Sequence, residues 1–268
     1  MLYEILIFAP VLGIVAGFLS GLLGIGGGVV IVPALIFMLP TLSSEVTNDN
    51  VALVAIATSL ATIVVTTFSS ARSHYHNGNV DVKFTTPIVM AVAITAIVAP
   101  YIAESIGGYW LTIVFSSLLI LVALQMLLSK PNDPSEQHEA TTEQLFLGGA
   151  LTGILAALAG LGGGAILVPY LTYIKVNIRK AIGAAAASGM VVALFGSAGY
   201  LMTGAGFSKS PEFIGYVHWP TALAIMVFSF LAAPWGAKVG QKLEQKQLKK
   251  IFAVFVILVA LKLIYEQF

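Results

Sequence analysis

The sequence predicts an all-α polytopic membrane protein of two inverted repeats, each a glycine-broken re-entrant helical hairpin followed by three transmembrane helices. Composition predicts the membrane: hydrophobic residues make up 58% of the 268 residues and charged residues 9%, and the mean hydropathy is +0.96. A soluble domain carries about 25% charged residues, so this chain lacks the polar surface to face water alone. The repeats are predicted by an internal duplication and by the distribution of basic residues.

The duplication relates residues 13–35 to residues 149–171, which lie 136 positions later, with 11 of 23 positions identical. Each copy contains a Gly-x-Gly-Gly-Gly run followed by Val-Pro, at 24–33 and at 160–169. A weak internal repeat of interrupted apolar segments is typical of duplicated membrane transporters. The two runs are therefore expected to lie at equivalent places in the two halves.

Apolar segments that reach or exceed the roughly 20 residues needed to cross a bilayer recur along the chain. They cover approximately 5–39, 50–70, 84–103, 109–129, 145–174, 181–203, 218–237 and 250–265. A polar, proline-containing stretch separates the fourth segment from the fifth and reads as a solvated linker. The predicted division is a first repeat at 1–129, a cytoplasmic linker at 130–144 and a second repeat at 145–268.

The first segment of each half is either one long kinked span or a hairpin of two short helices, such as 10–23 and 28–39. Arms of this length measure about 20 Å and turn back before crossing a 30 Å core. Lys and Arg concentrate in cytoplasmic loops, and a hairpin with the N-terminus outside places nearly all of them inside. Those residues are Arg72, Lys83, Lys130, Lys175, Arg179, Lys180, Lys238, Lys242, Lys246, Lys249 and Lys250. The charge pattern therefore favours the hairpin, and both termini are predicted outside.

In that arrangement the two hairpins open to opposite sides and their glycine tips approach each other near the membrane midplane. Oppositely oriented halves are the geometry that supports alternating access.

The start of the chain carries Glu4 and no basic region, so it does not read as a cleaved signal peptide.

At each tip a new helix begins, so unpaired N–H groups and the positive end of a helix dipole point into the bundle. Glycines let a ligand approach such N–H groups closely, and an oxyanion suits the site better than a cation. The predicted lining residues are Gly26, Gly27, Gly28, Gly162, Gly163 and Gly164. Close packing is the alternative, and it is the favoured role for Gly13, Gly17, Gly149 and Gly153.

Hydroxyls near the tips are further candidates for binding the anion: Ser20, Thr58, Ser59 and Ser188. Each also has a plain interpretation, because Ser and Thr often bond to their own helix backbone. Arg72 is either an anchor that fixes the topology or part of a vestibule that attracts anions.

Pro33 and Pro169 are predicted to shape the two tips. Each is either the first residue of its helix or lies one turn inside and frees the carbonyl four residues back. The sequence does not choose between these positions.

Several classes of function have no support in the sequence. There are no cysteines, no histidine pair with ligand spacing and hence no predicted metal site or cofactor. There is no nucleophile–base constellation for an enzyme and no basic patch for nucleic acid. No acidic residue lies at the centre of a span, where a proton relay would be expected.

The duplicated Gly-x-Gly-Gly-Gly-x-x-x-x-Pro core, at 24–33 and 160–169, resembles the sulfite exporter TauE/SafE family of membrane permeases over the full length. The Ala-Thr-Ser stretch at 57–59 fits the family pattern better than its counterpart at 187–188. The resemblance implies movement of small sulfur-containing anions, such as sulfite or sulfonates, across the bacterial inner membrane.

The leading hypothesis is therefore a secondary transporter, an exporter, of such an oxyanion. Its expected partners are the small anionic substrate and the lipid bilayer, with a homo-oligomer left open. A passive anion channel using the same tips is the alternative, and a non-transporting assembly subunit is a third.

Overall fold

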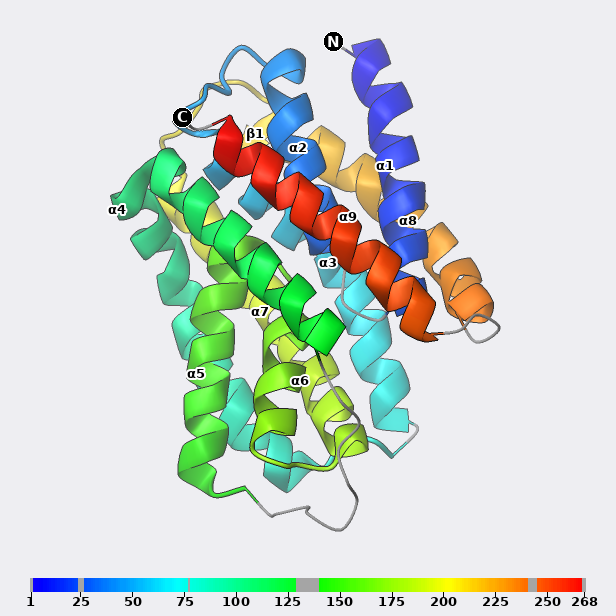
Figure 1. The fold of residues 1–268 in the computed structure, drawn as a ribbon. Helices are drawn as coiled ribbons and strands as arrows, with labels where there is room; N and C mark the ends of the chain where they lie inside the picture. Colours follow the sequence, from blue (N-terminus) through cyan, green and yellow to red (C-terminus); the bar gives the residue numbers. More distant parts are fainter. Residues whose placement is uncertain (1, 24–26, 77, 129–139, 241–244, 267–268) are drawn as a thin grey trace.

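The computed structural model describes residues 2–23, 27–76, 78–128, 140–240 and 245–266, and these form helices with one short strand pair. The first half contributes α1 (Leu2–Leu23), α2 (Gly28–Leu42), α3 (Val51–His76) and α4 (Val82–Leu128). The second half contributes α5 (Thr142–Ala159), α6 (Gly164–Tyr173), α7 (Ile178–Thr203), β1 (Phe213–Ile214), β2 (Val217–His218), α8 (Trp219–Gly240) and α9 (Gln245–Tyr265). Figure 1 shows the resulting bundle.

Helix α4 is two helices joined at Gly107, which has φ 78° and ψ 164°. A side chain rarely tolerates this conformation, so glycine is required there. The next residue, Gly108, lies against the backbone carbonyl of Asp49, which leaves no room for a side chain. The two parts, 82–106 and 108–128, correspond to the predicted segments 84–103 and 109–129, and each half thus contains five helical pieces in the same order.

The two glycine-broken segments fold as hairpins rather than as single spans. In Figure 1, α1 runs from the end of the molecule that holds both chain termini to its middle, and α2 returns toward that end. Helix α5 runs from the opposite end to the middle, and α6 turns back. The predicted arm at 10–23 was too short, because α1 continues back to Leu2 with Pro10 inside it. At about 33 Å, α1 is long enough to cross a bilayer, so its direction rather than its length marks the hairpin.

The two halves are interlocked through their first helices: α1 packs mainly on α8, and α5 packs mainly on α4. Gly13 and Gly17 lie directly on the backbone of α8 at Ile225 and Ser229. This close approach needs the absence of Cβ atoms. The packing role predicted for the outer glycines is confirmed here.

The equivalent contact in the second half follows the same pattern. Gly149 lies on the backbone of α4 at Ile88, and Gly153 lies at Val92 and Thr95. Each hairpin is therefore held by a helix of the other half, which a side-by-side arrangement of two repeats does not require.

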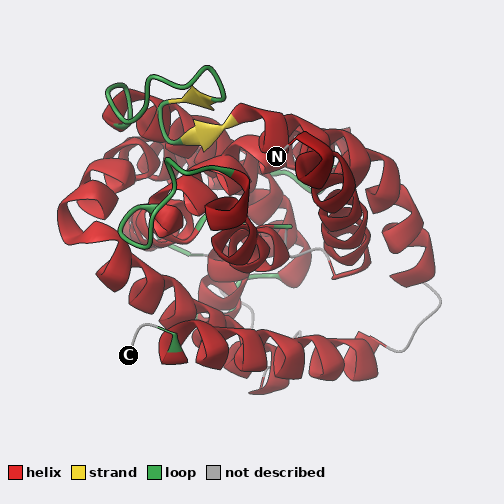
Figure 2. Ribbon diagram, turned by 90° about the horizontal axis from the view of Figure 1, so that it is seen from above, coloured by secondary structure: helices red, strands yellow, loops and turns green. Residues whose placement is uncertain are grey.

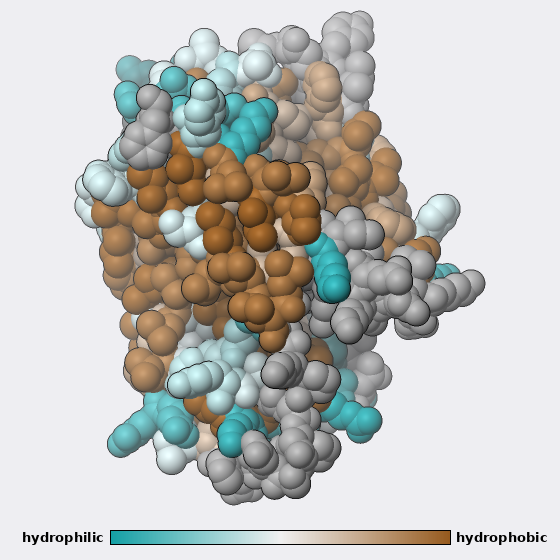
Figure 3. Space-filling view, viewed as in Figure 1, coloured by the Kyte–Doolittle hydropathy of each residue, from teal (hydrophilic) through white to brown (hydrophobic). Residues whose placement is uncertain are grey.

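The outer surface suits a lipid environment. Within the described residues, five helices are long and apolar enough to cross a membrane: α3, α4, α5, α7 and α8. Figure 3 shows an apolar band around the middle of one face, with hydrophilic residues gathered at both ends. Large apolar side chains such as Leu121, Phe230 and Leu258 are more than half exposed. The chain is a polytopic membrane protein.

The connection between α7 and α8 has no equal in the first half. It spans residues 204–218 and contains the antiparallel pair β1–β2, with Phe213 opposite His218. The corresponding connection between α3 and α4 covers only residues 77–81. Seen from the end that holds the termini, the strands lie on the side of the bundle opposite α9 (Figure 2).

Candidate functional site

The two hairpin tips meet inside the bundle. Gly28, the first residue of α2, lies directly against the backbone of Gly160 and Leu161, which begin the turn between α5 and α6. Gly160 has a left-handed conformation with φ 64°, and its N–H donates to the carbonyl of Ala156. Glycine is needed at 28 for the close approach and at 160 for the backbone angle.

This contact differs from the expected geometry in one respect. The sequence predicts tips that approach each other and line a site for an anion, whereas the described parts of the tips are packed backbone to backbone. The physical reason is that glycines without Cβ atoms allow the chains to touch, so no space remains between Gly28 and Gly160.

The hydroxyl of Ser59 on α3 fixes the second tip. Its Oγ donates to the carbonyl oxygen of Gly160 over 3.0 Å, and the side chain is fully buried. This bond satisfies an oxygen at the end of α5 that has no partner within the helix. Ser59 therefore lies at the second tip, where its hydroxyl bonds to the tip backbone; its predicted role in binding the anion stays a prediction.

Helices α2 and α6 begin at these tips without side-chain caps. Their N-cap residues are Gly27 and Gly163, which offer no side-chain hydrogen bond, and neither first turn contains an acidic residue. The N–H groups of Gly28 and Gly164 have no intrahelical acceptor, because they precede the first helical hydrogen bonds. Two positive helix ends are thus concentrated in the interior of the bundle.

Pro33 and Pro169 occupy equivalent places, each the sixth residue of its helix. Of the two positions that the sequence left open, the structure has the one inside the helix. Neither proline can donate to the carbonyl four residues earlier, which belongs to Val29 in α2 and Ala165 in α6. Each short helix thus carries a carbonyl oxygen released from the regular pattern within its first turns.

A narrow crevice opens beside the first tip. The predicted residues Ser20 and Gly27 line it. The remaining lining residues come from α1, α2, α3 and α8: Ala16, Gly17, Ile31, Ile63, Thr66 and Ser229. None of the lining side chains is charged, so the electrostatic field in the crevice comes from backbone dipoles and hydroxyls.

The second tip packs against α7. Gly163 lies on the backbone of Ser188 and Gly189, and Gly162 is buried while Gly164 is partly buried. The Oγ of Ser188 donates to the carbonyl of Ala184 in its own helix over 2.8 Å. Ser188 is thus beside the tip, with its hydroxyl engaged elsewhere.

The remaining predicted residues lie at different distances from the tips. Thr58 is fully buried on α3, and its Oγ1 accepts a hydrogen bond from the backbone N–H of His218 over 3.1 Å. Arg72 is exposed near the end of α3 and does not line the crevice. Gly26 and most of the linker 130–144 lie outside the described residues.

Two contacts were missed by sequence reasoning. Ser229 of α8 lines the crevice and touches Gly17, although no pattern in the sequence pairs α8 with α1. His218 is buried and bonded to Thr58, although no motif in the sequence marks it. The only available signals were the matching small-residue spacing on α1 and the aromatic cluster around His218.

These features define a class: a polytopic helical membrane protein with two oppositely directed, glycine-tipped hairpins that meet in the interior. The chain belongs to the sulfite exporter TauE/SafE family, whose model matches residues 9–263. This is a transporter family rather than an enzyme family, and the chain is a membrane transporter of it.

Named relatives cover nearly the whole chain. A "probable membrane transporter protein" of Haemophilus influenzae is 35% identical over 98% of this chain and 99% of its own length. The "probable membrane transporter protein YunE" of Bacillus subtilis is 28% identical over 96% of both chains. A probable membrane transporter protein of Methanocaldococcus jannaschii is 28% identical over 92% of both.

Proposed function

We propose that this chain exports a small sulfur-containing oxyanion, of the sulfite or organosulfonate type, by alternating access. The observation that carries the proposal is the pair of uncapped helix N-termini, at Gly28 and Gly164, in the interior of a membrane-spanning bundle. Unpaired N–H groups and positive dipole ends bind anions, and glycine allows the anion to approach them. The family name supports a sulfur oxyanion as the cargo.

The binding place in this proposal is the crevice beside Gly27, where Ser20 lies as a hydroxyl donor. Thr66 and Ser229 also line it, and their hydroxyls, which donate to the carbonyls of Ile63 and Met226 in their own helices, must turn to reach an anion. The absence of a charged lining residue agrees with a site that must release its anion, because a buried arginine would hold it too tightly. The second tip supplies the equivalent half-site when Gly163 separates from α7. Arg72 remains a candidate for the vestibule.

Alternating access is supported by the opposite directions of the two hairpins. We propose that α1–α2 with α3 and α4, and α5–α6 with α7, α8 and α9, are inverted repeats in the bilayer, with both termini outside. Because each hairpin is packed on the other half, the moving bodies are α1 with α8 and α5 with α4. Movement of one pair opens the crevice to one side only.

A passive anion channel is the competing proposal. The opposite directions of the two hairpins favour a carrier, because this geometry supports alternating access. Single-channel recordings in planar bilayers separate the two: discrete anion currents would contradict the carrier.

The central experiment is flux from proteoliposomes containing the purified chain. Radiolabelled sulfite is expected to leave the vesicles at a saturable rate, with competition from methanesulfonate and no competition from choline or glucose. If no anion is moved or competes, while a cation or neutral solute does, the anion site is wrong.

A further inference from the structure

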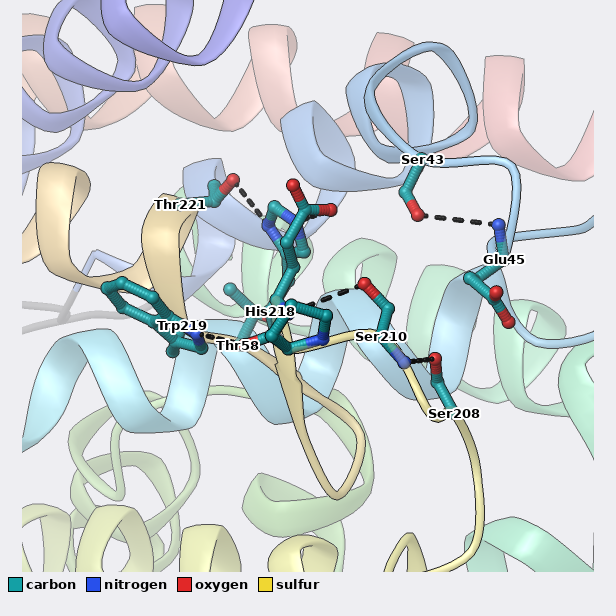
Figure 4. Close-up of polar contacts among 10 residues, drawn as sticks. Ser43, Glu45, Thr58, Ser208, Ser210, His218, Trp219 and Thr221 are labelled. Atoms are coloured by element: carbon teal, nitrogen blue, oxygen red, sulfur yellow. Dashed lines mark hydrogen bonds and ion pairs between the residues drawn. The ribbon is translucent and has the colours of Figure 1, made fainter. Parts of the chain in front are cut away.

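His218 is a fully buried histidine at the end of β2, held between two membrane-spanning helices. Its Nδ1 lies 2.8 Å from Oγ1 of Thr221 on α8, and its backbone N–H donates to Oγ1 of Thr58 on α3 over 3.1 Å. Its ring packs on Phe213, with ring centroids 4.9 Å apart. Figure 4 shows His218 with Thr58 and Thr221. One side of the imidazole is therefore firmly bonded.

The other ring nitrogen is left without a hydrogen bond among the described residues. Nε2 lies 3.8 Å from Oε2 of Glu212, whose side chain is 27% exposed. A buried polar atom without a partner costs free energy and is rare. Adding a proton to the imidazole makes both nitrogens donors, and the positive ring then lies at ion-pair distance from the carboxylate of Glu212.

Few other titratable groups surround His218, and none bonds to its ring. Tyr216 of the same hairpin donates to Oε1 of Glu104 on α4 over 2.9 Å, and the buried Tyr200 of α7 donates to the carbonyl of Ala157. The helices α3 and α8 present hydroxyls to it. Glu212 is thus the acid that acts on His218.

The position of His218 connects this pair to the candidate transport site. Thr58, which holds the backbone of His218, is followed in α3 by Ser59, which holds the carbonyl of Gly160 at the second tip. A change in how the β1–β2 strand pair, in the connection between α7 and α8, packs on α3 therefore acts one residue away from the tip contact.

We propose that His218, with Glu212, is the binding site of a proton that is coupled to anion transport. This rests on the proposed function and supplies the proton carrier that the spans themselves lack. Glu212, which reaches water, takes a proton from hydronium and passes it to Nε2. The result is one water molecule and an imidazolium–carboxylate pair, and the reverse transfer releases the proton.

The sign of the coupling follows from burial. Burial lowers the pKa of His218 below its ordinary value, while Glu212 acts in the opposite direction. We call the arrangement of this structure, with the β1–β2 pair packed on α3 and His218 buried, the closed state. A histidine whose pKa is lowered in the closed state stabilises that state above its ordinary pKa of about 6.5 and opposes it as the pH falls. Proton binding therefore favours a state in which the β1–β2 pair separates from α3 and His218 becomes exposed to water.

The first test measures proton binding without transport. In purified full-length protein with Trp110 and Trp235 replaced by Phe, Trp219 is the remaining tryptophan, and it is bonded to the hairpin at the carbonyl of Pro211. Its emission is expected to change with a midpoint below pH 6.5, and H218Q should abolish the change. The exposed His76 supplies the control, since H76Q should keep it. A flat titration, or the same titration in folded H218Q, would overturn the proton site.

The second test measures coupling in proteoliposomes with an entrapped pH dye during sulfite efflux. The number of protons moved per sulfite is expected to fall at least about tenfold in H218Q and E212Q relative to H76Q. Sulfite speciation is the same in every variant, so the comparison isolates the histidine pair. A wild-type proton ratio in either variant would overturn coupling. Failure of the unmodified protein to move sulfite refutes the proposed function instead, while the fluorescence titration still decides whether the proton binds.

Discussion

Helices of this protein begin in two different ways, depending on where they start. Helices α5 and α7 start at one end of the molecule with side-chain caps: Thr141 forms a capping box with Gln144, and Asn177 accepts from the N–H of Arg179. Helices α2 and α6 start inside the bundle at Gly27 and Gly163, which have no side chain to cap them. Capping is worth about 1 kcal/mol per helix, so the chain omits it where burial makes open N–H groups most costly. The difference is what we expect if, as proposed above, these N–H groups bind the transported anion.

The largest effect is expected when a negatively charged side chain is introduced at the first tip. Replacing Gly27 with Asp puts a carboxylate at the start of α2, where it competes with the transported anion. A side chain has space there with a small shift of Ile31. Sulfite flux should fall about a hundredfold in G27D and much less in G27N, a contrast of about 2.7 kcal/mol or less.

The matched control places the same charge at a capped start. T141D keeps a good N-cap at the end of the molecule and should transport at the normal rate. Equal loss of flux in G27D and G27N would show that size, not charge, matters at the tip.

The next effect concerns the contact between the tips. A methyl group at Gly28 would meet the carbonyl of Gly160, whereas one at Gly206 meets nothing within 4 Å. Overpacking costs about 1–3 kcal/mol, so G28A should lower the thermal stability in detergent and reduce sulfite flux by about tenfold or more. G206A should change neither, and a fully active, stable G28A would remove the tip contact from the mechanism.

A smaller effect separates the two equivalent serines. Ser59 bonds across the halves to Gly160, while Ser188 bonds within its own helix to Ala184. S59A leaves a buried carbonyl unpaired and should cost about 1–2 kcal/mol, with slower sulfite flux. S188A should cost under about 0.5 kcal/mol, because the helix keeps its backbone bonds. Thermal unfolding of the two variants, side by side, checks this order; a larger loss in S188A would reverse the assignment.

An effect smaller than that of S59A is expected at the capped helix start itself. T141A removes the capping box of α5 and should lower stability by about 0.5–1 kcal/mol. Sulfite flux at 25 °C should stay within twofold of the unchanged protein. Transport loss beyond that would mean that the end of α5 takes part in function, contrary to the division drawn above.

Much of the fold could be predicted because residues close in sequence determine where helices end and break. The expected segments 109–129 and 181–203 match the second part of α4 and α7 within a few residues, and Gly107 marks the break in α4. The pairs of helices that pack against each other depend on contacts between residues far apart in the sequence. The small-residue face of Gly13 and Gly17 predicts close packing, but it does not name α8 as the partner.

The candidate site was predicted in its backbone and not in its side-chain bonds. Glycine runs and the repeat indicate two helix starts that face each other. The hydroxyl of Ser59 and that of Ser188 look alike in sequence, and only the three-dimensional contact with Gly160 distinguishes them. The proton pair was missed because Glu212 and His218 lie in a connection between spans, where a search for acids within spans does not reach.

The packing of α1 on α8 has a consequence for biosynthesis. Roughly 200 residues separate the end of α1 from the start of α8, and translation at 5–20 residues per second takes about 10–40 s to produce them. During that time the face of α1 that contains Gly13 and Gly17 lies in the membrane without its native partner α8. Helix α5 finds α4 already inserted. Two repeats that end in equivalent contacts are thus assembled by unequal routes, and a chain interrupted before residue 219 would leave an unpaired helix for quality control to recognise.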